Sequence, residues 1–322
     1  MTLTDRTSVT PSTLALAGLL AVTAAWGSTF FMLKGVLERV PAADFLAVRF
    51  AIATLVLAAI APHAVRRLTP RARRQGVALG LVFGAGQLLQ TVGLETTSAS
   101  VSGFVTGMYV VFTPLLGALL LGARLPASAW SAVGLATVGL GVLSLQGLAV
   151  GTGEALTLLG ALAYAAHIVG LGRWSSAGDT VGLAIVQLAT TAVVCTVGAL
   201  PGGVVVPSTT GDWMVLLHMA LVAGALAMIV QTWAQARLAP TRAAVVMTME
   251  PVWAAGFAVA FGGEHLGPRV AVGGVLVMVA MWLVERGAAE SVEDLQDLQE
   301  LQDLRAYDAD VPVPRHPVLE PV

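Results

Sequence analysis

The chain has 322 residues, of which 57% are hydrophobic and only 11% are charged. Soluble globular chains carry roughly twice that share of charged residues, so the composition excludes an ordinary soluble domain. The formal net charge is −2, which also excludes the overall excess of basic residues expected of a protein that binds nucleic acid.

Ten apolar stretches of near-spanning length follow one another along the chain, and a membrane-spanning helix needs about 20 such residues. Polar and apolar residues do not alternate within these stretches as they do in barrel strands, which argues against an outer-membrane barrel. The number of uninterrupted stretches also disfavours a large soluble core of buried helices. The sequence therefore predicts an all-α membrane protein with ten transmembrane helices, at residues 13–33, 43–62, 75–95, 99–121, 127–146, 153–172, 179–200, 212–234, 240–262 and 268–285.

Two groups of five stretches resemble each other. Gln90-Thr91 lies 34 residues before the segment 124–126, and Gln231-Thr232 lies 33 residues before the segment 264–266. A repeat with an odd number of spans enters the membrane from the opposite side the second time. We therefore expect two inverted five-helix repeats, an arrangement used by secondary transporters. We call residues 13–146 the first half and residues 147–286 the second half.

The arginines predict the orientation, because loops rich in arginine and lysine stay in the cytoplasm. Both termini, residues 1–12 and 287–322, then lie in the cytoplasm of a multi-pass plasma-membrane protein. The C-terminal segment is acidic and is expected to be disordered. The arginines on the predicted cytoplasmic face are Arg66, Arg67, Arg71, Arg73, Arg74, Arg124, Arg173, Arg237 and Arg242.

Sequence motifs for catalysis are not found. The chain shows no metal-ligand spacing, no phosphate loop and no nucleophile motif, so we expect neither an enzyme nor a cofactor or metal. ATP-driven pumping would require another chain. The GxxxG patterns at 80–84 and 103–107 indicate close helix packing more than ligand binding.

Glu250 is the most informative ionisable residue, because a carboxyl group in the middle of an apolar stretch is costly. Pro251 follows it and has no N–H, which frees the carbonyl of Met247 one turn earlier. The site could bind a cation, a substrate amine or a proton. Alternatively, a protonated Glu250 forms a hydrogen bond to a neighbouring helix.

Arg49 and His167 also lie within apolar stretches. Arg49 could extend its stem outward to the membrane surface, pair with Glu250 or Glu95, or hold an anionic substrate group. His167 could take part in proton coupling or donate a hydrogen bond to an adjacent helix.

Neutral polar and aromatic side chains complete the candidate pathway. The amides either line a polar cavity or tie helices together, and the aromatic residues either form cavity walls or mark the membrane interface. The amides are Gln87, Gln90, Gln187 and Gln231, and the aromatic candidates include Trp26 and Tyr109.

Several short motifs follow one another along the chain: Trp26-Gly-Ser-Thr-Phe-Phe, Arg49-Phe50, Thr97-Ser-Ala-Ser100, Leu121-Gly-Ala-Arg-Leu125, Tyr164-Ala-Ala-His-Ile, Glu250-Pro251 and Gly263-Glu264-His-Leu266. With them the chain resembles the EamA-type members of the drug/metabolite transporter superfamily over about residues 12–286. The resemblance implies an alternating-access carrier with a central cavity between its halves. Such carriers usually export amino acids, metabolites or drugs.

The residues leave other functions open. A channel would be expected to show rings of charge or a filter sequence, and neither is visible. A non-transporting scaffold would need no mid-membrane Glu250 beside a proline. For the transporter, Glu250 and His167 are the proton candidates, and Arg49 is an internal counter-charge.

Overall fold

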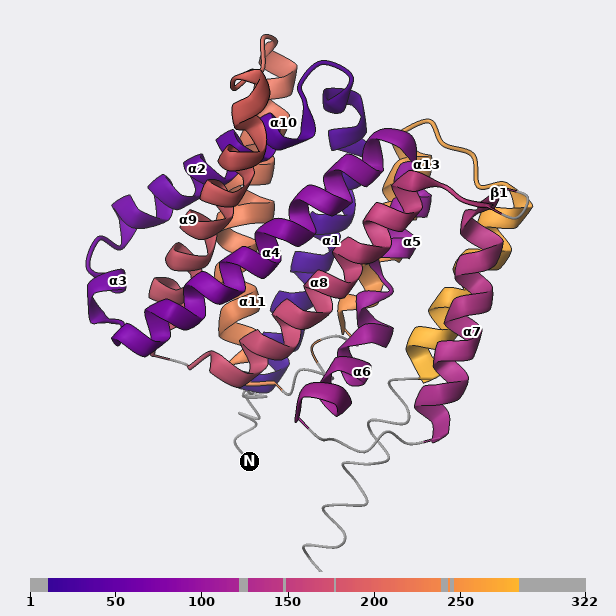
Figure 1. Cartoon of the computed structure of the whole chain (residues 1–322), viewed down its shortest axis with the longest axis horizontal. Coiled ribbons are helices and arrows are strands. Elements are labelled where there is room, and N and C mark those ends of the chain that lie inside the picture. The colour runs from indigo at the N-terminus through magenta and orange to yellow at the C-terminus, as the bar shows by residue number, and fades with distance from the viewer. Residues whose placement is uncertain are drawn as a thin grey trace, which may run out of the picture.

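The computed structural model describes residues 11–121, 127–146, 149–176, 178–238, 243 and 246–283. They form a helical bundle (Figure 1). Its first half contains α1 (Pro11–Leu37), α2 (Ala42–Ile60), α3 (Ala64–Arg67), α4 (Pro70–Thr96), α5 (Ala99–Thr106), α6 (Tyr109–Leu121) and α7 (Ala127–Ser144). The second half contains α8 (Thr152–Trp174), α9 (Thr180–Ala199), η1 (Leu200–Gly202), α10 (Thr210–Ala220), η2 (Leu221–Leu226), α11 (Ala227–Gln235) and α13 (Met249–Ala260). A further apolar helix covers Pro268–Leu283.

The predicted helical class is confirmed. Within the described ranges, the only strands are β1 (Leu145–Gln146) and β2 (Ala149–Val150), which pair antiparallel at the junction of the halves. Seven helices of the described chain are long and apolar enough to cross a membrane, and two shorter apolar helices accompany them.

Two of the predicted stretches are interrupted helices. The fourth, 99–121, divides into α5 and α6 around Gly107 and Met108. In the eighth, 212–234, a six-residue π-helix, η2, separates α10 from α11. Such wide turns often mark functional positions, because they release backbone groups from the regular hydrogen-bond ladder.

Local sequence signals place the helix starts. Thr69 caps α4 by accepting a hydrogen bond from the backbone N–H of Ala72 at 3.1 Å, with Pro70 at the first helical position. Ser98 caps α5 in the same way by accepting from Val101 N at 3.2 Å. Thr209 caps α10.

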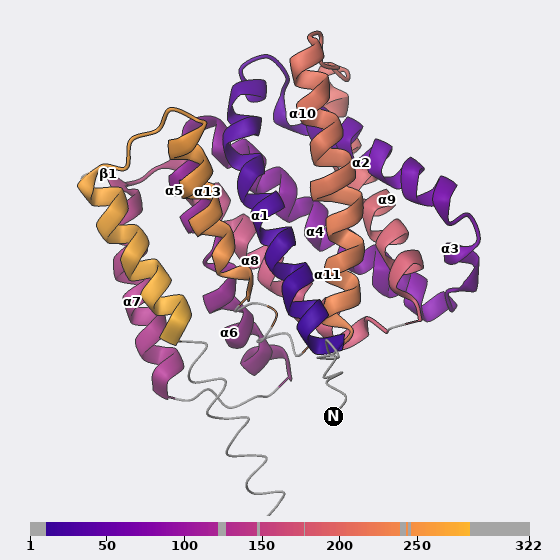
Figure 2. The ribbon, with the colours of Figure 1, turned by 180° about the vertical axis from the view of Figure 1, so that it is seen from behind.

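The helices of the two halves pack in matching pairs (Figures 1 and 2). In the first half, α4, α5 and α6 all pack on α8, the first helix of the second half. In the second half, α11 and α13 correspondingly pack on α1, the first helix of the first half. α2 meets α9, and α5 meets α13. α7 and the helix Pro268–Leu283 stand side by side at the edge of the bundle in both views. The same set of helix contacts is therefore found again when each helix is replaced by the corresponding helix of the other half.

The glycine patterns bring helices into close contact, as predicted. A Cβ on Gly80 would lie 2.6 Å from the carbonyl oxygen of Gln187 on α9, and one on Gly103 would lie 2.6 Å from Ala254 on α13. Neither site has room for a side chain. These glycines therefore serve helix packing.

The corner between α4 and α5 is held by a cation and a carboxylate. Lys34 at the end of α1 donates hydrogen bonds from Nζ to three backbone carbonyls at the end of α4, those of Leu94 (2.7 Å), Glu95 (3.1 Å) and Thr97 (2.5 Å). These carbonyls carry the negative end of the helix dipole, which favours a cation there.

Glu264, which follows α13, binds the other side of this corner. Its Oε1 accepts from Ala99 N at 2.6 Å, and its Oε2 accepts from Ser100 N at 3.1 Å and from Ser100 Oγ at 2.6 Å. The carboxylate thus caps the positive N-terminus of α5 and ties the second half to the first.

Candidate functional site

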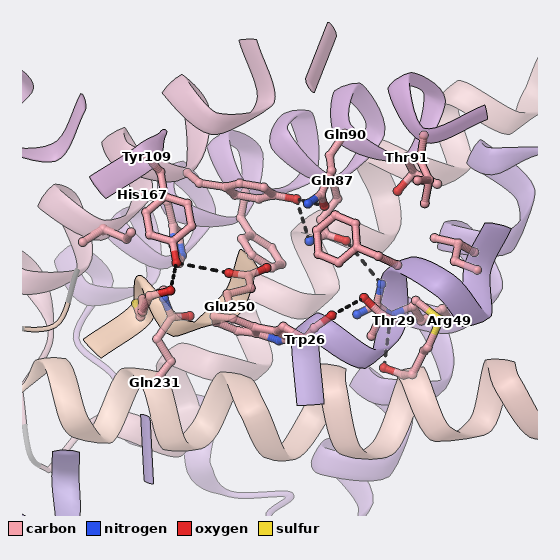
Figure 3. A pocket seen from close by; sticks show the side chains of 18 residues that line it. Trp26, Thr29, Arg49, Gln87, Gln90, Thr91, Tyr109, His167, Gln231 and Glu250 are labelled. Carbon is pink, nitrogen blue, oxygen red and sulfur yellow. Dashed lines mark hydrogen bonds between the residues drawn. The ribbon is translucent and has the colours of Figure 1, made fainter. Parts of the chain in front are cut away.

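A cavity opens among helices of both halves (Figure 3). It contains about 640 Å³ of space not filled by atoms, including the part open to solvent. Both halves contribute to its wall. The lining residues are Trp26, Thr29, Phe30, Leu33, Arg49, Phe83, Gln87, Gln90, Thr91, Leu94, Tyr109, Tyr164, His167, Ile168, Met219, Gln231, Met247 and Glu250.

Most of the candidate residues from the sequence lie on this wall. Gln187 does not, because it points from α9 toward His167 behind the wall. The residues that the cavity brings together are Trp26, Arg49, Gln87, Gln90, Tyr109, His167, Gln231 and Glu250.

Glu250 lies in the first turn of α13 and is 5% exposed. The hydroxyl of Tyr109 donates its one hydrogen to the carbonyl oxygen of Met247 at 2.8 Å, and its oxygen lies 3.1 Å from Glu250 Oε2. This carbonyl is the one that Pro251 leaves without its helical partner. The break between α5 and α6 therefore places a phenol against the opened turn of α13.

Arg49 is 4% exposed and does not extend to the membrane surface. Its Nε donates to the carbonyl oxygen of Met219 at 3.1 Å, and its Nη2 lies 3.5 Å from that of Ala223 in η2. Among the described residues, no ion pair joins it to Glu250 or Glu95, so the direct pairing considered from the sequence is absent. The carbonyls beside the π-helical turn take the place of a carboxylate.

A chain of hydrogen bonds runs from Arg49 along the wall. Arg49 Nη1 donates to Gln87 Oε1 (3.3 Å), and Gln87 Nε2 donates to the hydroxyl of Tyr164 (2.8 Å). That hydroxyl donates to Gln90 Oε1 (2.7 Å), and Gln90 Nε2 donates to Thr106 Oγ1 (2.9 Å). We call these five residues the Arg49 chain. It joins α2, α4 and α5 of the first half to α8 of the second.

His167 faces the cavity while its ring is held from behind. Its Nε2 lies 2.7 Å from Gln187 Oε1, and Gln187 Nε2 donates to the carbonyl oxygen of Leu183 at 3.2 Å. Because this amide nitrogen is already used as a donor, Gln187 presents its oxygen, and His167 Nε2 carries the hydrogen between them. The ring also packs on Phe83, with centroids 5.0 Å apart.

Two further predicted residues complete the wall. Trp26 Nε1 donates to the carbonyl oxygen of Ala223 at 2.9 Å, the same carbonyl that Arg49 approaches. Gln231 is 2% exposed, and its Oε1 has no hydrogen-bond partner. A buried amide oxygen without a partner is an open acceptor for a solute or a water molecule.

Tyr164 and Thr106 belong to the Arg49 chain, and sequence reasoning did not assign them to the site. Tyr164 lies three residues before His167, which puts both on one helical face, and this spacing is the signal that could have placed it. Thr106 has no such signal. Across the described ranges, no group of three His, Cys, Asp or Glu side chains is placed to hold a metal ion.

Comparison with known proteins gives three similarities. The profile of the EamA-like transporter family matches residues 13–145 and again residues 151–286. An uncharacterized transporter of Archaeoglobus fulgidus is 31% identical over 268 residues, which cover 83% of this chain and 84% of that protein. A crystal structure of another protein has a TM-score of 0.64 at 17% identity, over 84% of this chain and 96% of the other, a likeness that concerns the fold alone.

Proposed function

Because the chain belongs to the EamA-like transporter family, we propose that it is a secondary transporter that exports a small organic solute by alternating access. The observation that carries the proposal is the cavity between the halves. It contains a buried carboxyl group, Glu250, and a buried guanidinium, Arg49, that are not paired with each other. Unpaired buried charges are costly unless a ligand or an ion compensates them.

The proposed architecture is ten spans in two inverted repeats, with both termini in the cytoplasm of a plasma-membrane protein. The exchange of contacts between the halves supports it, since α1, α2 and α4 of the first half take the positions of α8, α9 and α10–α11 in the second. Rocking of the halves about the cavity would then expose it to each side in turn.

Within the cavity, Glu250 and His167 are the proposed proton-carrying groups. The hydroxyl of Tyr109 lies 3.1 Å from Glu250 Oε2, and Gln187 fixes the ring of His167 from behind. Gln87, Gln90, Gln231 and Trp26 form the solute path. The solute would be an amino acid, metabolite or drug small enough for the space.

Purified protein in liposomes tests the proposal. A mixture of labelled amino acids, carboxylates and amines should show saturable flux and counter-exchange, and a pH gradient should drive accumulation. A scaffold would give no flux with any of them, and a channel would give flux without saturation or counter-exchange.

Glu250→Gln separates proton coupling from transport itself. We expect it to abolish accumulation driven by the pH gradient and to keep exchange of solute for solute. Glu95→Gln is the matched control, because its side chain is exposed outside the cavity. Loss of proton-driven accumulation in both variants would contradict the role of Glu250.

A further inference from the structure

Arg49 faces the cavity without an anion. Its hydrogen-bond partners are two backbone carbonyls and one neutral amide, and no carboxylate lies within 4.0 Å of it in the part of the chain that the structure describes. A buried guanidinium held only by neutral groups remains an uncompensated charge. It therefore attracts an anion into the cavity.

Arg49 also fixes the direction of every hydrogen bond in the Arg49 chain. A guanidinium can only donate, so Gln87 must turn its oxygen toward Arg49 and its nitrogen toward Tyr164. The Tyr164 hydroxyl then accepts from Gln87 and passes its own hydrogen to Gln90 Oε1. Gln90 consequently turns its nitrogen toward Thr106.

This polarity determines what the wall offers to a solute. The guanidinium has five N–H groups, of which three are directed at the partners described above. Gln87 and Gln90 each use one of two amide hydrogens within the chain. The spare N–H groups belong to three side chains that line the cavity, Arg49, Gln87 and Gln90.

We propose that Tyr164 is the positioning residue that keeps this wall a donor surface, and that the surface receives the anionic head, such as a carboxylate, of the transported solute. The proposal rests on the proposed transport function and narrows its substrate class. Without the hydroxyl, Gln90 loses its link to Arg49, and its amide can turn its oxygen to the cavity. An anionic head would then meet an acceptor in place of a donor.

Binding of benzoate and benzamide to the purified protein tests this by isothermal titration in chloride-free buffer. The two probes share their shape and differ in the charge of the head. The wild-type protein should bind benzoate at least about tenfold more tightly than benzamide, because hydrogen bonds to charged groups are the stronger ones. Tyr164→Phe should lower this preference about tenfold.

Thr106→Val tests the far end of the chain, where no solute contact is involved, since Thr106 does not line the cavity. It should reduce the preference by a smaller factor, because Gln90 loses only its anchor. Thr54→Val is the matched control: Thr54 lies on α2 outside the cavity, and its hydroxyl donates only to the carbonyl oxygen of Phe50. If Tyr164→Phe does not fold, Thr106→Val decides.

Three results would overturn the proposal: no benzoate preference in the wild-type protein, an unchanged preference in folded Tyr164→Phe and Thr106→Val, or chloride binding as tightly as benzoate. A different result would contradict the proposed transport function. Vesicles that show no flux, from protein that prefers benzoate in solution, would contradict the transporter and leave the donor surface intact.

Discussion

Glu264→Ala should destabilise the protein by removing the cap of α5. The carboxylate accepts two backbone N–H groups and one hydroxyl, all from Ala99 and Ser100, at 2.6–3.1 Å. Alanine leaves these donors without their acceptor at the positive end of a helix. The change touches no cavity residue, so its effect is on folding and on the contact between the halves.

The geometry sets the size of the effect. A hydrogen bond to a charged acceptor contributes about 1.5–3 kcal/mol. Glu264 is half-exposed, so water replaces part of that contribution, and Ser98 still caps the helix. The free energy of unfolding should therefore fall by about 2 kcal/mol, as it does when a strong N-cap is removed. At roughly 2 °C per kcal/mol for a chain of this size, the melting temperature falls by about 4 °C.

Thermal unfolding in one detergent measures this loss. Glu264→Gln keeps one acceptor oxygen and should melt between the wild-type protein and Glu264→Ala. Glu95→Ala is the control at the same corner, because its exposed carboxylate makes no hydrogen bond among the described residues, and it should shift the melting temperature by less than about 1 °C. The capping argument fails if Glu264→Ala melts with the wild-type protein.

Three further changes have defined outcomes. Gly27→Ala puts a Cβ 2.5 Å from the side chain of Trp253 on α13 and should reduce transport at least about tenfold. Gly35→Ala is the control, since a Cβ there would meet nothing within 4 Å, and it should leave transport unchanged. Equal transport by the two variants would refute the close packing of α1 on α13. Tyr109→Phe leaves the buried carbonyl of Met247 without a donor and should lower stability by about 1–3 kcal/mol, measured as a denaturation midpoint. Arg39 donates hydrogen bonds to both carboxylate oxygens of Asp212 on α10, and this raises the pKa of Arg39 above its ordinary value. The arginine's contribution to stability is therefore fully present at neutral pH and is lost only in strongly alkaline solution. The difference in melting temperature between wild type and Arg39→Gln should be constant from pH 6 to 9, and a slope there would contradict the pairing.

The features that the sequence predicts correctly are those that depend on residues close together in the chain. Apolar run length predicts the helical membrane class, and the missing N–H of Pro251 predicts the free carbonyl of Met247. The donor that this carbonyl meets is Tyr109, 138 residues away, and no local rule selects it. Pairings at that distance depend on how the helices dock.

The four glutamines show the same limit. Each is a neutral amide in an apolar stretch, so the sequence treats them alike. Helix rotation separates them: Gln87, Gln90 and Gln231 face the cavity, whereas Gln187 orients His167 from behind. The partners of Arg49 could not be predicted either, because two of its acceptors are backbone carbonyls in or next to the π-helix η2. The residue types of η2 do not predict a π-helix.

Lys34 is the only lysine in the chain. Because its amine donates hydrogen bonds to three carbonyls at the end of α4, we expect it to react more slowly with amine-reactive reagents while that corner stays closed. Acylation of this one side chain, read by mass spectrometry against the N-terminal amine as an internal standard, would report when the end of α1 leaves the corner. The unmodified protein thus contains its own chemical probe of opening at that end of the bundle.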